Sequence, residues 1–141
     1  MINLKKKMNE SYLGAQFHHN GIACENIEKT FSLLKIFLPK EIEYSDNIFD
    51  SKLNAELKLI KLNKECFIEL VSGKVVEGFI KKKIFIYHNC FEVEKLSDFS
   101  ENLLKLNFIP ITKPTPADLL GGRLVQFFHT QFGVMEILEK D

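Results

Sequence analysis

The stretch Phe17-His18-His19-Asn20-Gly21-Ile22-Ala23-Cys24 has the short, mixed polar and apolar composition of a β-strand. Its His-Asn pair returns 69 positions later, in a second strand-like stretch, Tyr87-His88-Asn89-Cys90-Phe91-Glu92-Val93. Each stretch leads into a segment with helical periodicity. The chain therefore contains two copies of one strand–helix unit, and this repeat organises the rest of the sequence.

The repeat extends beyond these first strands. Glu25-Asn26-Ile27 before the first helical segment corresponds to Glu94-Lys95-Leu96 before the second. Near the end of each copy, Phe67-Ile68-Glu69-Leu70 corresponds to Val134-Met135-Glu136-Ile137, 67 positions later. Two copies are too few for a solenoid, so the pattern indicates a duplicated module. Each module has a helix for one sheet face and leaves the other face apolar, so we expect the paired copies to enclose a shared cavity.

The repeat predicts an α+β fold in which two βαβββ modules form one domain, a half-open barrel around a metal site. We expect a flexible leader over residues 1–15 and a single domain over residues 16–141. Within the domain we expect module one at about 16–73, a connector at about 74–83 and module two at about 84–141.

Two helices are predicted from their apolar faces. The first begins after Asn26 as N-cap and ends at Pro39, with a face made of Ile27, Phe31, Leu34 and Leu38. The second has Ser97 as its predicted N-cap and a face made of Phe99, Leu103 and Leu106.

The composition excludes several classes of function. The chain has 141 residues, of which 45% are hydrophobic and 27% charged, the balance of a globular protein. Nineteen basic and nineteen acidic residues give no net charge, which removes the long-range attraction to phosphate that nucleic-acid binding needs. No apolar run approaches the roughly 20 residues that span a bilayer. Three cysteines without a C-x-x-C pair indicate neither a disulfide framework nor a zinc knuckle, so we expect a reduced, cytoplasmic protein with a small-molecule function.

One histidine near the start and one glutamate near the end of each module carry the candidate chemistry. The repeat relates His19 to His88 and Glu69 to Glu136, so we expect these four side chains to meet at one point. Two imidazoles and two carboxylates suit a borderline divalent cation such as Co²⁺, Mn²⁺, Ni²⁺ or Zn²⁺. The two carboxylate charges balance the ion, and four protein ligands leave octahedral positions open for a substrate.

These stretches resemble the vicinal-oxygen-chelate superfamily, which includes glyoxalases, bleomycin-resistance proteins and dioxygenases. The run from His18 to Ile27 is similar to its opening strand and helix start, and its other anchor strands are matched by Phe67–Leu70, Tyr87–Val93 and Gly133–Ile137. The resemblance covers about residues 17 to 139. Pro114-Thr115-Pro116-Ala117, running into Gly121-Gly122-Arg123, is typical of the methylmalonyl-CoA epimerase-like and glyoxalase-like branch.

His18 competes with His19 for the role of first ligand. It stands where an acidic residue is common in the superfamily, and Asn20 stands where an apolar residue is common. Alternation along the strand places His18 on the face opposite to His19. Gly21-Ile22-Ala23 aligns the strand so that His19 is the predicted ligand.

The resemblance implies a metal-dependent enzyme with one divalent ion bound by His19, Glu69, His88 and Glu136. The implied enzyme is an isomerase that removes the proton next to a thioester carbonyl through a metal-stabilised enolate. Glu136 is then also the candidate catalytic base. Glu56 is the only carboxylate near the place of a second base, although its alternation with Leu57 equally suits a solvent-facing residue.

Further expectations concern the substrate and the partners. Arg123, at the mouth of the cavity, is a candidate to bind a substrate carboxylate. The resemblance implies an acyl-CoA or a glutathione adduct as substrate and a homodimer, and the balanced charge and the absence of a long apolar run predict no nucleic-acid or membrane partner. Two alternatives stay open: a lactoylglutathione-lyase-type enzyme and a non-catalytic small-molecule binding or resistance protein. An iron oxygenase is disfavoured because it usually needs only two histidines and one carboxylate, and Glu69 would be superfluous.

Overall fold

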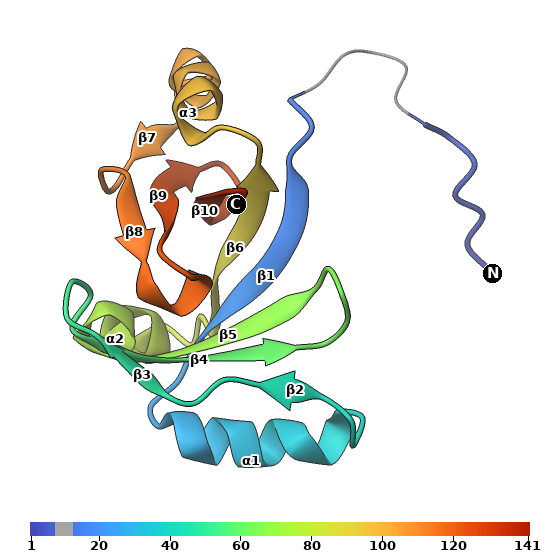
Figure 1. Ribbon diagram of the computed structural model, residues 1–141, viewed down its shortest axis with the longest axis vertical. Coiled ribbons are helices and arrows are strands. Elements are labelled where there is room, and N and C mark those ends of the chain that lie inside the picture. The colour runs from blue at the N-terminus through green and yellow to red at the C-terminus, as the bar shows by residue number, and fades with distance from the viewer. Residues whose placement is uncertain (8–12) are drawn as a thin grey trace.

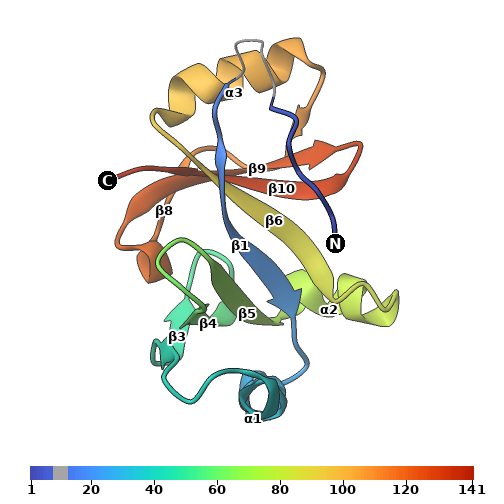
Figure 2. The same cartoon turned by 90° about the vertical axis from the view of Figure 1, so that its right-hand side faces the viewer.

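Two strands, β1 (Gln16–Ala23) and β6 (Ile86–Val93), run antiparallel to each other through the middle of the fold and join its two halves (Figure 2). The computed structural model describes residues 1–7 and 13–141. Asn20 lies opposite Asn89 in this strand pair, and the side-chain amide of Asn20 donates a hydrogen bond to the carboxamide oxygen of Asn89. Because the repeat relates these two residues to each other, their contact marks the pseudo-twofold axis of the molecule.

Each half consists of one strand, one helix and a group of further strands, and Figure 1 shows α1 and α3 at opposite ends of the molecule. The first half contains β1, α1 (Ile27–Phe37), β2 (Glu43–Tyr44), β3 (Ile48–Asp50), β4 (Ala55–Lys61) and β5 (Phe67–Gly73). The second contains β6, α3 (Leu96–Lys105), β7 (Ile109–Pro110), β8 (Thr115–Ala117), the short 3-10 helix η1 (Asp118–Leu120), β9 (Arg123–Thr130) and β10 (Gly133–Glu139).

The strands form one mixed ten-stranded sheet in the order β2-β4-β5-β1-β6-β10-β9-β7, with β3 beside β4 and β8 beside β9. Strand β1 is parallel to β5, and β6 is parallel to β10. Among the described residues, the end strands β2 and β7 do not pair with each other, so the sheet stays open. The predicted α+β fold of two βαβββ modules in a half-open barrel is confirmed. In each module the edge strand is split into two short pieces.

Helix α1 forms where the apolar periodicity predicts it. The side chain of Asn26 accepts a hydrogen bond of 2.8 Å from the backbone N–H of Lys29, so Asn26 is the N-cap. The helix ends at Phe37, shortly before Pro39, which cannot continue it. Its apolar face packs on the outer side of the first half-sheet in a buried cluster of Cys24, Ile27, Phe31, Ile60 and Leu70.

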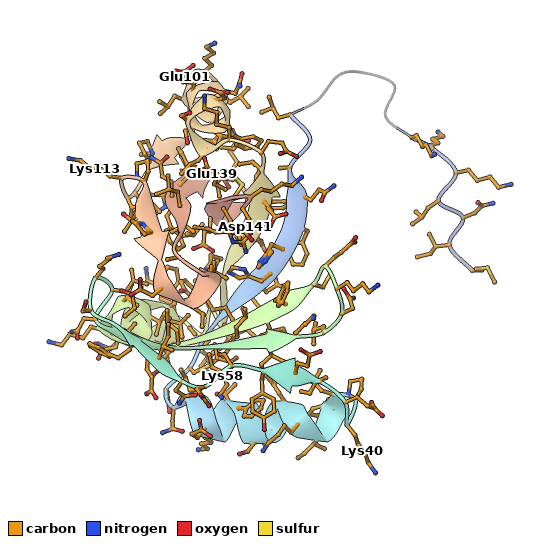
Figure 3. All side chains as sticks on the ribbon, in the orientation of Figure 1. Lys40, Lys58, Glu101, Lys113, Glu139 and Asp141 are labelled. Carbon is orange, nitrogen blue, oxygen red and sulfur yellow. The ribbon has the colours of Figure 1, made fainter. Side chains whose placement is uncertain are left out.

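Helix α3 is capped by a distant residue instead of a local one. The helix begins at Leu96 after Lys95, so the predicted N-cap at Ser97 is wrong. The backbone N–H of Leu96 donates a 2.8 Å hydrogen bond to Oε2 of Glu139. Figure 3 shows Glu139 in the half of the molecule that contains α3. A carboxylate at this end also suits the helix dipole. The end of β10 therefore fixes where α3 begins.

The connector between the modules is a helix, α2 (Lys74–Lys81), which follows β5 without a break. Its residue Val76 is fully buried in a cluster with Ala23, Ala55, Leu57 and Val71. Residues 8–12 of the predicted leader lie outside the described residues, and residues 1–7 are exposed without helix or strand. None of the helices in the described ranges is long and apolar enough to cross a membrane.

Candidate metal centre

The four predicted ligands come from the four central strands of the sheet. His19 lies on β1, Glu69 on β5, His88 on β6 and Glu136 on β10. Glu69 lies opposite Gly21 of β1, two residues from His19, and Glu136 lies opposite Cys90 of β6, two residues from His88. Since side chains two apart on a strand share a face, each carboxylate points to the same side as the neighbouring imidazole. All four residues are buried.

The facing atoms of these four residues have the spacing of metal ligands. Nε2 of His19 lies 3.1 Å from Nε2 of His88 and 3.1 Å from Oε1 of Glu136. The same oxygen lies 3.6 Å from Nε2 of His88, and the Glu69 carboxylate lies 3.8 Å from each imidazole. Two ligands bound at about 2.1 Å lie about 3.0 Å apart at a right angle and about 3.4 Å apart in a tetrahedron. One ligand atom from each of His19, Glu69 and His88 lies within 4.8 Å of the other two, and Oε1 of Glu136 lies within 3.6 Å of both imidazoles, so these residues suit one divalent ion once the Glu69 carboxylate moves closer.

Burial and the neighbouring charges together set the ionisation of the four groups. It lowers the pKa of His88 to about 4 and raises the pKa of Glu69 to about 7. Burial alone would raise the pKa of Glu136, but the nearby imidazoles of His19 and His88 outweigh it and lower that pKa to about 2. Burial also acts to lower the pKa of His19, whereas Glu136 and Glu69 outweigh it and raise that pKa. A proton on His19 thus partly balances the carboxylates, and a divalent ion would take its place.

We call His19, Glu69, His88 and Glu136 the quartet. Two of its buried atoms have no hydrogen-bond partner among the described residues: Nδ1 of His88 and Oε1 of Glu136. The Glu136 oxygen approaches His19 closely without the geometry of a hydrogen bond. Leaving a buried polar atom unpaired costs on the order of 1–3 kcal/mol. A cation between the imidazoles and the carboxylates would remove this cost at Glu136, which supports the quartet as a metal centre.

Alternation along β1 predicts that His18 lies on the face opposite to His19, and this prediction is wrong. A β-bulge interrupts the register between Phe17 and His19, and His18 is the extra residue. As a result, the His18 ring is buried, and its Nδ1 lies 2.8 Å from Nδ1 of His19. Burial lowers the pKa of His18 to about 4. A bulge depends on the partner strand, so the sequence of β1 alone carries no signal for it.

A small cavity of about 170 Å³ opens beside the quartet and is lined by Glu69, Glu136, Tyr87 and apolar residues of β8, η1 and β9. A third carboxylate, Asp50 at the end of β3, is buried and lines the same cavity. Its Oδ1 accepts hydrogen bonds from the backbone N–H groups of Lys52 and Leu53, at 2.9 and 3.1 Å. Sequence reasoning missed Asp50 because β3 is too short to show an alternating pattern.

Two predicted site residues lie elsewhere. Glu56 is exposed on β4, where its carboxylate accepts a hydrogen bond from Asn47, so the structure does not bring it to the quartet. Arg123 does not line the cavity beside the quartet. Its Nη1 donates a 2.7 Å hydrogen bond to Glu92, and it lines a second cavity of about 600 Å³ together with His18. Its guanidinium is already neutralised by a carboxylate of this chain.

Comparisons with known proteins give a likeness in fold. No protein-family model matches the chain, and no curated protein matches it in sequence. Among solved structures, a methylmalonyl-CoA epimerase from Mycobacterium tuberculosis is similar with a TM-score of 0.77 and 13% identity, over 95% of this chain and 93% of that one. A hypothetical protein from Bacillus halodurans is similar with a TM-score of 0.75 and 19% identity, over 90% of this chain and 95% of that one.

A variant methylmalonyl-CoA epimerase from Streptomyces coelicolor, in complex with 2-nitronate-propionyl-CoA, is similar with a TM-score of 0.75 and 12% identity. This likeness covers 89% of this chain and 96% of that one. At these identities the comparison concerns the backbone arrangement and not the reaction. The chain has the fold of the methylmalonyl-CoA epimerases.

Proposed function

We propose that this protein is a metal-dependent isomerase that moves a proton at the carbon next to the carbonyl of a small acyl thioester. The observation that carries the proposal is the buried quartet of two imidazoles and two carboxylates, with facing atoms 3.1 to 3.8 Å apart. A divalent ion held by His19, Glu69, His88 and Glu136 would act as a Lewis acid for the substrate carbonyl. The likeness in fold to methylmalonyl-CoA epimerases supports the same class of substrate.

The size of the cavity favours a small acyl group. A volume of about 170 Å³ is below the usual range of about 300–1,000 Å³ for pockets that enclose a whole ligand. Only the acyl end of a thioester would enter, and the carrier would extend beyond the cavity. Pro116, Leu120 and Val125 give the cavity an apolar wall, which excludes water from the reacting carbon.

Proton transfer in this cavity needs carboxylates on both sides of the substrate carbon. Glu136 is the proposed base: it takes the α-proton while the electron pair of the broken C–H bond moves onto the substrate as an enolate. Asp50 is the proposed second group, because it is the other buried acid that lines the cavity and is not part of the quartet. The Asp50 carboxyl group, in its protonated form, returns a proton to the opposite face of the carbon as the electron pair of the enolate forms the new C–H bond, which inverts the configuration.

Exchange of the α-proton with solvent tests the proposal. Protein loaded with Co²⁺ is incubated in D₂O with methylmalonyl-CoA, with propionyl-CoA and with the methylglyoxal–glutathione adduct, and deuterium in each compound is measured by mass spectrometry. We expect incorporation into an acyl-CoA. The matched control is His88→Ala, which removes one ligand of the quartet and should abolish the exchange.

Each alternative result has a clear meaning. Turnover of the glutathione adduct without exchange in either acyl-CoA would replace the proposal with a lactoylglutathione-lyase-type reaction. Exchange that is equally fast in His88→Ala would contradict the role of the quartet. Tight binding of a panel compound without any exchange would favour a non-catalytic binding protein.

A further inference from the structure

His18 contacts the nitrogen of His19 that points away from the quartet. The Nδ1 atoms of the two rings lie 2.8 Å apart, whereas Nε2 of His19 faces His88 and the two carboxylates. A neutral imidazole carries one N–H, and the nitrogen that bears this hydrogen cannot also bind a metal ion. The atom that contacts Nδ1 of His19 therefore decides whether the hydrogen lies on Nδ1, which leaves Nε2 free to bind the ion.

The fold holds the His18 ring in place. The bulge in β1 turns the ring toward His19, and the ring stacks on Phe67 of β5 with centroids 4.6 Å apart and planes within 18°. The residue is 7% exposed, and it lines the 600 Å³ cavity. A ring fixed by a backbone irregularity and by an aromatic neighbour can hold a hydrogen bond at little cost in entropy.

We propose that His18 is a positioning residue whose Nδ1 accepts the Nδ1–H of His19 and so keeps Nε2 of His19 free to bind the ion. The inference rests on the metal centre of the proposed function. Metal-bound histidines usually donate their other ring N–H to a protein acceptor, and loss of that acceptor weakens metal binding. In this protein the acceptor is the imidazole of the preceding residue, His18.

The second module lacks this contact. Nδ1 of His88 has no hydrogen-bond partner among the described residues. Tyr87, which occupies the bulge of β6 that corresponds to His18, packs edge-on against the His88 ring, with centroids 4.5 Å apart. His88 is thus held by packing, whereas His19 is held by a hydrogen bond. The positioning contact is therefore a property of this chain's first module and not of the repeat.

Metal affinity tests the inference. His18→Phe keeps a ring that can stack on Phe67 and removes the acceptor. We expect its dissociation constant for Co²⁺, measured by competition with a chelator, to rise by about 10- to 100-fold. His18→Gln restores an acceptor oxygen and should recover part of the affinity. The matched control is His129→Phe, which makes the same change at an exposed histidine of β9 and should leave the dissociation constant unchanged.

A second measurement does not depend on any variant. In the Zn²⁺-loaded wild-type protein, two-bond ¹H–¹⁵N spectra should show His19 with its proton on Nδ1 and His18 with its proton on Nε2, because only an unprotonated Nδ1 of His18 can accept the hydrogen bond. Wild-type affinity in His18→Phe, or a proton on Nδ1 of His18, would overturn the positioning role and leave the metal centre intact. Failure of the wild-type protein to bind Co²⁺ or Zn²⁺ at all would overturn both. Should His18→Phe not fold, the spectrum of the wild-type protein decides.

Discussion

The imidazole of His88 lies directly against the α-carbon of Gly21, its neighbour across the β1–β6 pair. A Cβ atom at position 21 would lie 2.0 Å from Cε1 and 2.2 Å from Nδ1 of this ring. No side chain fits there, so the strand needs glycine for space. The repeat relates Gly21 to Cys90, which lies opposite His19 in the same strand pair. The two histidines of the quartet therefore meet different neighbours, although the modules are related by a pseudo-twofold axis.

Gly21→Ala should displace the His88 ring and weaken metal binding. We expect the dissociation constant for Co²⁺ to rise at least about tenfold and the free energy of unfolding to fall by about 1–3 kcal/mol, because the added methyl group overpacks a buried site. The matched control is Gly78→Ala in α2, where a Cβ meets nothing within 4 Å. That variant should be stabilised by about 0.5–1 kcal/mol. Unchanged Co²⁺ affinity in Gly21→Ala would contradict this account of the site.

Binding of an ion to the folded protein should raise its melting temperature. At a Co²⁺ concentration 100 times the dissociation constant, mass action adds about 2.7 kcal/mol to the free energy of unfolding. Addition of a chelator should reverse the shift. Differential scanning calorimetry of wild-type and His88→Ala protein, with and without Co²⁺, measures the effect. Equal shifts in the two proteins would mean that the ion binds outside the quartet.

Glu69→Gln should change the pH dependence of stability in the metal-free protein. Burial raises the pKa of Glu69 to about 7, so the folded state favours the protonated form. That stabilisation is complete below the unfolded pKa near 4.5 and is lost as pH rises through about 7. The variant mimics the protonated side chain at every pH. We therefore expect both proteins to be similarly stable at low pH, and the variant to be the more stable at pH 8.

Urea denaturation of both proteins at several pH values, with chelator present, checks this expectation. Glu56→Gln is the control, since it makes the same change at an exposed carboxylate on β4. Its stability relative to wild type should not depend on pH in this range. A difference between Glu69→Gln and wild type that stays constant with pH would show that Glu69 does not titrate near neutrality.

Asp50→Asn should slow the isomerisation without loss of metal. The asparagine keeps the Oδ1 acceptor for the backbone N–H groups of Lys52 and Leu53 and removes the carboxyl group that would hold and return the proton. In the D₂O experiment we expect the net inversion of configuration to fall by about 10²- to 10⁴-fold, the usual contribution of a general acid or base. Co²⁺ content should match that of the wild type. Wild-type inversion in Asp50→Asn would show that another group returns the proton.

Local sequence decided the elements whose signals are contained in one segment. Helix α1 begins after Asn26 because that side chain caps the helix from within three residues. Helix α3 has no such cap, and a carboxylate 43 positions away on β10 supplies it. The local sequence predicts Ser97 as the N-cap, whereas the contact with Glu139 determines the start of the helix. A hydrogen bond between distant residues leaves no pattern in the segment that it caps.

The same distinction separates the quartet from the residues around it. The repeat predicted that His19, Glu69, His88 and Glu136 would converge, because it places one histidine and one glutamate at equivalent positions of two modules related by one axis. The place of His18 depends on a bulge, that of Arg123 on the carboxylate of Glu92, and that of Asp50 on how β3 lies beside β4. The sequence by itself thus determined the duplicated architecture and which four residues come together at its centre, since periodicity and symmetry are properties of the chain. Tertiary structure decided which further side chains reach them, because strand register and long-range pairing arise only when separate segments meet.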